Sequence, residues 1–597
     1  MSHGRKNLEL VAPHSKMYKG KFGRLFRTLP AWSPRGVPQG EERKFFLEFA
    51  NKNMIELKDG NGKPLGPSDI ANDRDIIEKL EKEFDSNIPA GYTYFGQFVD
   101  HDITFDPTPL GGRDSDPNGL VNHRTPRLDL DSVYGGGSDV SPYLYEFDAG
   151  NNFTGKFLID KVQSKVDRDT QNNRQSKEVT YSDLPRNNRG REGSDFVNRA
   201  LIGDVRNDEN SIVTQVHLAF LLAHNNLVDK ALIKLKAEKV DVRKQSKIAF
   251  GQARNTLQWL YQYIVWNDYL SRITDKKIRK NALIIKTDTG RNIVELGYKD
   301  VYRWKEQPFI PVEFSVAAYR FGHSMVRNSY RTNSDVHESA DVFIPIFNNV
   351  AQSTGNNLRG FRKLSALNII QWDWFLDMES SKGQFPQRAR NIDTKLSNAL
   401  SFLHEEMTGD PLNILAARNL ERGHKLGLPS GTDVAKTLGY KPLSLKPDDY
   451  DGQAIHIKYK ENSLWFYILK EADERNKKAM RRLEDLEALE GSQSLNGKTQ
   501  KELDEMRMES KEGIGPVMGQ VGSTIICATF AGLLKGDPNS FVNMCPDWEP
   551  EDDELLKNHT VELTQDAISE DNKWTVASII RLSGLPIKGG DIRFQPS

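Results

Sequence analysis

The segment Phe95-Gly-Gln-Phe-Val-Asp-His-Asp-Ile-Thr-Phe-Asp-Pro107 contains four polar side chains within six consecutive residues. If the segment is a helix with 3.6 residues per turn, Gln97, Asp100 and His101 lie on one face. Asp102 is then rotated from that face by about 100°. The segment predicts a helix that presents an amide, a carboxylate and an imidazole to one pocket, and a second carboxylate elsewhere. The alternative is an amphipathic helix whose histidine is solvated or hydrogen-bonded in the core.

The composition excludes several classes of function. The 597 residues carry a net charge of −1 with a pI near 6.9, so no strong field attracts nucleic acid. Cys527 and Cys545 are the only cysteines, which excludes a disulfide framework and a CxxC metal site. The amino terminus lacks an apolar signal-peptide core, and no apolar run is long enough for a transmembrane segment. We expect a soluble chain that is either cytoplasmic or released without a cleaved leader. The sequence does not indicate an oligomeric state.

The chain divides by composition into an arm and a helical domain. Residues 1–85 are rich in Lys, Gly and Pro, which predicts an extended N-terminal arm with little regular structure. The remainder, 86–597, is expected to form one large domain. Apolar residues at helical spacing predict helices at about 196–275, 312–328, 394–407, 411–420 and 520–535. Because there is no βαβ alternation and no internal repeat, the predicted fold class is mainly α with little β-structure.

The segment from about 470 to 513 is dominated by charged residues. Its Glu, Arg and Leu spacing from Met480 to Leu489 is typical of a solvated helix, and Gly491 predicts where that helix ends. We interpret the segment as an exposed helical insertion. The alternative is a surface that binds a partner.

A second polar cluster lies between Thr125 and Gly135. Thr125, Asp129 and Asp131 offer hard oxygen ligands in a turn-prone stretch, which suits calcium. Asp102, which leaves the His101 face, could complete the ligand set and tie this loop to the helix. The alternative is that these side chains form only local Asx and ST turns.

A third cluster lies at the entry to the helix that begins near Ser211. Arg206 and Glu209 are three residues apart and would lie together. The alternative is a capping and surface ion-pair cluster. His217 and His224 are seven residues apart on the following helix, and we expect both to be buried structural histidines.

Two further clusters lie in the second half of the chain. Gly322 directly precedes His323, and the missing side chain would let a bulky group approach closely. Asn419 and Arg422 are three residues apart on another predicted helix.

Taken in order, the five clusters resemble the animal-type haem peroxidases of the peroxidase-cyclooxygenase superfamily, over roughly residues 85–440. The resemblance implies a helical fold with haem buried between core helices, and the small number of cysteines favours a bacterial member. The residues that carry it are Gly96-Gln-Phe-Val-Asp-His-Asp102, Thr125-x-Arg-x-Asp-x-Asp-x-Val-Tyr-Gly135, Gly203-Asp-x-Arg206-x-x-Glu209, Arg320-Phe-Gly-His323 and Asn419-x-x-Arg422.

The resemblance assigns a role to each residue around the iron. His323 would be the proximal ligand of the haem iron, and Asn419 would accept a hydrogen bond from its other ring nitrogen. His101 would be the distal base that moves the peroxide proton. Arg206 would stabilise the charge that develops as the peroxide bond breaks, and Gln97 would hold a distal water or a small anion.

The resemblance also implies contacts to the haem periphery. Asp100 and Glu209 stand where family members form ester bonds to haem methyl groups, so covalent attachment of a haem b is possible. Asn210 stands where myeloperoxidase has a methionine linked to a vinyl group, so that link should be absent. Arg320 and Arg422 are implied as further haem-binding residues.

The same resemblance implies a calcium site. Its ligands would come from one residue of the distal helix and four of the loop that follows it, namely Asp102, Thr125, Arg127, Asp129 and Asp131.

The function expected from these residues is reduction of hydrogen peroxide and oxidation of small electron donors such as phenols, halides or thiocyanate. One alternative is a fatty-acid dioxygenase of the same superfamily, which needs a tyrosine three residues before the proximal histidine. That position here is Arg320, and Tyr319 is one residue away. The other alternative is a non-catalytic haem-binding protein, against which the presence of His101, Arg206, His323 and Asn419 argues.

Overall fold

The computed structural model describes residues 22–592 with several gaps. The gaps are 35, 107–119, 171–172, 189–197, 289–290, 305–306, 338–340, 348–355, 379, 404–412, 444–461, 492–516 and 558–573. The first part of the predicted arm, the end of the charged segment and residues 404–412 of two predicted helices therefore lie outside the described residues.

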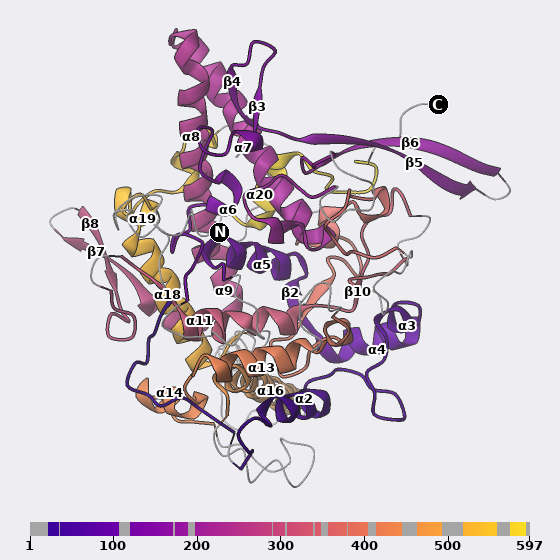
Figure 1. Ribbon diagram of the computed structural model, residues 1–597, viewed down its shortest axis with the longest axis vertical. Coiled ribbons are helices and arrows are strands. Elements are labelled where there is room, and N and C mark those ends of the chain that lie inside the picture. The colour runs from indigo at the N-terminus through magenta and orange to yellow at the C-terminus, as the bar shows by residue number, and fades with distance from the viewer. Residues whose placement is uncertain are drawn as a thin grey trace.

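Three helices form the centre and upper part of the molecule in Figure 1: α5 (Gly91–Ile103), α7 (Ser211–Ala237) and α8 (Val242–Ile264). α7 and α8 pack as a helical hairpin, and α5 and α20 (Val576–Ser583) pack against α7. Asn210 and Asp241 begin the two long helices, because their side chains accept hydrogen bonds from the first backbone N–H groups. The first half of α7 is buried on all sides, which makes it the central core helix.

The lower part of the molecule in Figure 1 includes helices that pack on the segment carrying His323. α16 (Leu464–Gly491) and α18 (Gln520–Gly536) pack directly on that segment, and α13 (Leu415–Lys425) packs between α16 and α2 (Glu42–Asn53). α16 ends at Gly491 as predicted, but Leu464 to Leu469 at its start are buried, so the helix is anchored in the core. Further helices described are α3 (Pro67–Ala71), α4 (Arg74–Phe84), α6 (Asp131–Tyr134), α9 (Leu270–Ile273), α10 (Lys276–Ala282), α11 (Val312–Ser315), α14 (Gly431–Thr437) and α19 (Phe541–Met544).

Within the described residues, the strands form two-stranded sheets only. The longest is the protruding hairpin of β5 (Asp160–Thr170) and β6 (Asn173–Asp183). The other pairs are β1 (Phe22–Gly23) with β9 (Ile310–Pro311), β2 (Asp85–Pro89) with β12 (Arg388–Arg390), β3 (Tyr145–Phe147) with β4 (Phe153–Phe157), β7 (Leu283–Asp288) with β8 (Arg291–Leu296), and β10 (Ser329–Tyr330) with β11 (Ile344–Pro345). The prediction of a mainly α fold with little β-structure is confirmed.

The N-terminal segment differs from the extended arm that we expected. Three helices, α2, α3 and α4, form within residues 42–84. Their apolar residues, such as Phe46 and Phe49 in α2 and Ile77 and Leu80 in α4, are spaced three residues apart and buried. The many Lys, Gly and Pro residues of the segment obscured this helical spacing.

The segment predicted as a helix at 312–328 is broken. α11 ends at Ser315, and a 3₁₀ helix, η4 (Ala318–Met325), follows it. Because a 3₁₀ helix has three residues per turn, Arg320 and His323 lie directly above one another.

Candidate active site

The predicted polar face of α5 exists and meets the segment that precedes α7. The Gln97 amide donates to the Glu209 carboxylate through Nε2 and accepts from Asn210 Nδ2 at 3.2 Å. Nε2 of His101 lies 3.9 Å from Oε1 of the same glutamate. The structure therefore brings Gln97 and His101, which helical spacing predicted on one face of α5, together with Glu209, which that spacing did not place there.

The orientation of His101 is set by Asn207, which the sequence analysis did not identify. Asn207 Oδ1 lies 2.8 Å from His101 Nδ1, and Asn207 Nδ2 lies 3.0 Å from His217 Nδ1. If Asn207 accepts the Nδ1 proton of His101, the Nε2 lone pair is left free on the side of Glu209. The sequence signal for Asn207 was only its place between Arg206 and Glu209.

Burial keeps the imidazole of His101 neutral. His101 is 5% exposed, and burial, followed by the nearby positive charge of Arg206, lowers the pKa of His101 to about 4. At neutral pH the ring can accept a proton at Nε2. Burial also lowers the pKa of both His217 and His224 to about 3, as expected for structural histidines.

Arg206 is held at the end of α5. Its guanidinium pairs with Asp204 at 2.7 Å and donates to the backbone carbonyls of His101 at 3.0 Å and Thr104 at 2.6 Å. It also stacks over Phe105, 4.6 Å from the ring centroid. The side chain is therefore fixed near His101 without a hydrogen bond to its imidazole.

The two carboxylates implied as ester positions differ in their surroundings. Burial, opposed by the positive charge of Arg206, raises the pKa of Glu209 to about 7. The Asp100 carboxylate accepts a hydrogen bond from Thr104 Oγ1 at 2.9 Å. The positive charge of Arg320, three residues before His323, also contributes to lowering the pKa of Glu209.

On the opposite side, His323 is paired with Asn419. The Asn419 amide nitrogen lies 2.7 Å from Nδ1 of His323. Iron ligation through Nε2 requires a proton on Nδ1, and the other orientation of the amide presents its oxygen to that proton. Burial lowers the pKa of His323 to about 3, so the ring is neutral.

Two arginines flank His323. Arg320 donates to the Ser315 carbonyl at 3.0 Å, and Arg422 forms an ion pair with Asp106, just beyond α5. The ion pair between Arg422 and Asp106 joins α13 to the residues that follow α5. Tyr319 does not enter this group, because its hydroxyl donates to the Gly96 carbonyl at 3.3 Å within the core.

The Asp102 side chain points away from the face of α5 that carries His101, as predicted, and contacts the loop of residues 125–135. Its carboxylate accepts hydrogen bonds from the backbone N–H of Leu130 at 3.2 Å and from the hydroxyl of Ser132 at 3.0 Å. Leu130 has a φ of 57°, a left-handed conformation that these contacts stabilise. Asp102 thus fixes the loop to α5.

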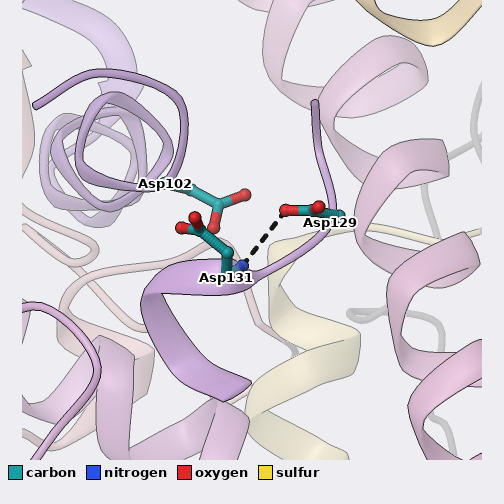
Figure 2. A group of neighbouring side chains, drawn as sticks. All are labelled: Asp102, Asp129 and Asp131. Carbon is teal, nitrogen blue, oxygen red and sulfur yellow. Dashed lines mark hydrogen bonds between the residues drawn. The ribbon is translucent and has the colours of Figure 1, made fainter. Parts of the chain in front are cut away.

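Three aspartates converge at this point (Figure 2). Oxygens of Asp102, Asp129 and Asp131 all lie within 4.8 Å of one another. Burial, and then the charges of the other two, raises the pKa of Asp102 well above its usual range. Thr125 Oγ1 donates to Asp129 at 2.8 Å, so the predicted residue lies at the same place.

Arg127 cannot bind a cation through its guanidinium, which donates to Gln307 at 2.9 Å. Its backbone carbonyl is the only group that it could offer to calcium. Arg124, which the sequence analysis did not identify, donates to Asp131 at 3.1 Å and to Asp204 at 2.9 Å. This arginine therefore connects the aspartate group with the segment that carries Arg206.

No helix of the described residues is long and apolar enough to cross a membrane.

Among solved structures, one with a TM-score above 0.5 supports the fold. Peroxidase A from Dictyostelium discoideum aligns over 97% of this chain and 96% of its own, with a TM-score of 0.53 at 16% identity. A fatty acid alpha-dioxygenase of Oryza sativa aligns over 89% of this chain and 85% of its own, with a TM-score of 0.45 at 13% identity.

Comparison with known sequences identifies the family. The chain is 28% identical over 238 residues to chorion peroxidase of Drosophila melanogaster, covering 39% of this chain and 26% of that protein. It is 26% identical over 242 residues to the peroxidasin homolog pxn-2 of Caenorhabditis elegans, covering 40% of this chain and 15% of that protein. The chain thus matches about a quarter or less of the length of these relatives. The sequence model of the animal haem peroxidase family matches residues 108–449, more than half of the chain. This chain therefore belongs to the animal haem peroxidase family.

Proposed function

We propose that the chain is a haem-dependent peroxidase that reduces hydrogen peroxide and oxidises small electron donors, such as phenols, halides or thiocyanate. One observation carries this proposal: two neutral histidines, on the packed elements α5 and η4, each have Nδ1 beside an asparagine side chain. The pairs are His101 with Asn207 and His323 with Asn419. Such pairing frees Nε2 of one ring for a proton and of the other for a metal.

The residues around His323 fit a haem. A Cβ added to Gly322 would meet no atom within 4 Å, so open space adjoins the residue that directly precedes His323. Nε2 of His323 makes no hydrogen bond to any residue that the structure describes. His323 would ligate the iron, and Arg320 and Arg422 would lie toward the acidic edge of the macrocycle.

When bound, the haem supplies the redox chemistry that cleaves the peroxide bond. Nε2 of His101 accepts a proton from the incoming peroxide and returns it to the oxygen that leaves as water. Arg206, held by Asp204 and two carbonyls, stabilises the negative charge that develops on that oxygen. Gln97 positions a water or small anion beside the histidine.

Covalent attachment of the haem through Asp100 and Glu209 forms part of the proposal. Each ester would require peroxide to oxidise a haem methyl group by two electrons, with loss of a proton, so that the carboxylate oxygen of Glu209 or Asp100 can bond to that carbon. Attachment would therefore depend on turnover. Asp100 would first have to release the hydroxyl of Thr104.

A spectrum of the haem-reconstituted protein tests the function. Stoichiometric hydrogen peroxide should shift the Soret band, and iodide or a phenol should restore it. Haem that remains with the protein after acid-acetone extraction would support the esters. If peroxide only bleaches the haem while a polyunsaturated fatty acid drives oxygen uptake, the dioxygenase alternative is correct instead.

Asn207 is proposed as a positioning residue for His101. Asn207→Leu should slow the reaction with peroxide by about tenfold while haem content stays unchanged, because His101 loses its fixed tautomer. Asn207→Asp, which still accepts the Nδ1 proton, should restore most of the rate. Stopped-flow rates of the Soret change at several pH values provide the measurement. Equal rates for all three proteins would contradict the role.

We also propose that the aspartate group binds calcium. Two oxygens that ligate one calcium ion at about 2.3–2.6 Å cannot be more than about 5 Å apart. The three carboxylates meet this limit, and Thr125 adds a further oxygen. Calcium would offset the repulsion between the buried carboxylates and so hold the loop against α5.

Removal of calcium should therefore lower stability. Chelation should reduce the melting temperature of the wild-type protein, since calcium at about 100 times its dissociation constant contributes about 2.7 kcal/mol. Asp129→Ala should melt at the lower temperature with or without chelator. Asp300→Ala, which removes an exposed carboxylate, serves as the matched control. A chelator effect that persists unchanged in Asp129→Ala would place the ion elsewhere.

A further inference from the structure

One end of the molecule concentrates positive charge. The hairpin tip, defined here as residues 230–248, comprises the end of α7, a short turn and the start of α8. It contains seven Lys or Arg residues against two acidic residues, whereas the whole chain carries a net charge of −1. In Figure 1 this end of the α7 and α8 hairpin lies at the top of the long axis.

Four of these charges are not neutralised. Lys234 pairs with Glu238 and Glu554, and Arg243 pairs with Asp241. Lys230 is half-buried and also has a partner. The other four lysines are exposed, and their side chains form no ion pair or hydrogen bond with the part of the chain that the structure describes. They are Lys236, Lys239, Lys244 and Lys247.

The same tip exposes branched aliphatic side chains. Ile233 is 71% exposed and Val242 is 77% exposed, the two highest values among the large apolar residues that the structure describes. Single exposed apolar residues are common on protein surfaces, but here the two most exposed ones stand among the unpaired lysines. Leu235 and Ala249, at 3% and 0% exposure, pack the two helices together, so the tip is a firmly packed element.

An aromatic surface continues from the tip to the neighbouring hairpin. Phe147 of β3 is 38% exposed and lies 5.9 Å from Phe153 of β4, measured between ring centroids. Phe153 lies 5.4 Å from Phe250 of α8. The β3 and β4 hairpin lies beside the helices at the same end of the molecule (Figure 1).

We propose that the hairpin tip docks on a membrane surface that contains anionic lipids. The four lysines would lie among the negatively charged headgroups. Ile233 and Val242 would enter the boundary between headgroups and acyl chains. A nucleic acid would use the lysines equally, but it offers no apolar layer for the two aliphatic side chains. The combination of unpaired lysines and exposed aliphatic side chains therefore favours a lipid surface over a nucleic acid as the partner.

Vesicle flotation of the full-length holoprotein tests this proposal. The protein should bind vesicles of phosphatidylcholine containing about one third phosphatidylglycerol at least about tenfold more tightly than vesicles of phosphatidylcholine alone. Binding should weaken as salt is raised from about 0.05 to 0.5 M, because the Debye length shortens. Equal binding to both vesicles, or to neither, would overturn the proposal.

Variants separate the tip from the general charge of the protein. Changing Lys236, Lys239, Lys244 and Lys247 to Glu together should abolish binding to the anionic vesicles. The matched control makes the same change at four exposed lysines elsewhere, and it should bind much as the wild type does. The control lysines are Lys44, Lys63, Lys79 and Lys382. An equal loss in the control would show that only net charge matters, and an unchanged Soret band confirms that each variant is folded.

A second pair of measurements distinguishes lipid from other polyanions. Ile233→Ser with Val242→Ser should weaken vesicle binding at least about fivefold and leave any retention on a DNA duplex unchanged. If the double variant binds vesicles like the wild type, or if the wild-type protein binds DNA more tightly than vesicles, the surface is a polyanion site and the lipid proposal fails.

Discussion

His323→Ala is expected to yield a folded protein that no longer retains haem. Among the described residues, His323 is the histidine that borders the open space beside Gly322 and that has its Nδ1 next to an asparagine side chain. Without the imidazole, no nitrogen would remain to ligate iron on this side. The expected result is loss of the Soret band after desalting, measured against protein concentration.

Two further variants make this prediction specific. His323→Gly should regain the Soret band when imidazole is added, because the small molecule fills the vacated position. His424→Ala removes a part-buried histidine five residues after Asn419 that packs against Phe46, and it should retain haem. Haem bound tightly by His323→Ala would contradict the assignment of the proximal ligand.

His101→Ala should bind haem normally but react with hydrogen peroxide about 10²–10⁴-fold more slowly. The mutation removes the group that accepts and returns the peroxide proton, while His323 and its partner Asn419 are unchanged. Stopped-flow absorbance at the Soret band measures the rate constant directly. An unaltered rate constant would show that another group moves the proton.

The pH dependence of the wild-type rate provides a second readout. The pKa of His101 is lowered to about 4, so the ring is neutral and active as a base above that pH. The rate constant should stay constant from pH 8 to about 5 and fall as the pH decreases through 4. The Asn207→Leu variant should shift this fall, because it removes the contact that helps to set the pKa of His101.

Helical periodicity placed side chains correctly where the residues share one helix, α5. Gln97 and His101 contact the same glutamate, and Asp102 turns to the loop of residues 125–135, as helical periodicity requires. The sequence predicted helices less well where apolar residues at helical spacing are interspersed with residues typical of loops. The helices α2 and α4 were missed among Lys, Gly and Pro residues, and the break between α11 and η4 was not visible in the apolar spacing.

By itself, the sequence determined the fold class, the helix that carries His101 and the direction in which each of its polar side chains leaves that helix. These follow from the repeat of 3.6 residues, which is a local property of the backbone. Only the tertiary structure decided that Asn207 fixes His101, that the carbonyls of His101 and Thr104 hold Arg206, and that Arg124 connects the aspartates with Asp204. Such contacts join segments up to about a hundred residues apart, and they exist only because the packing of α5 against α7 brings those segments together.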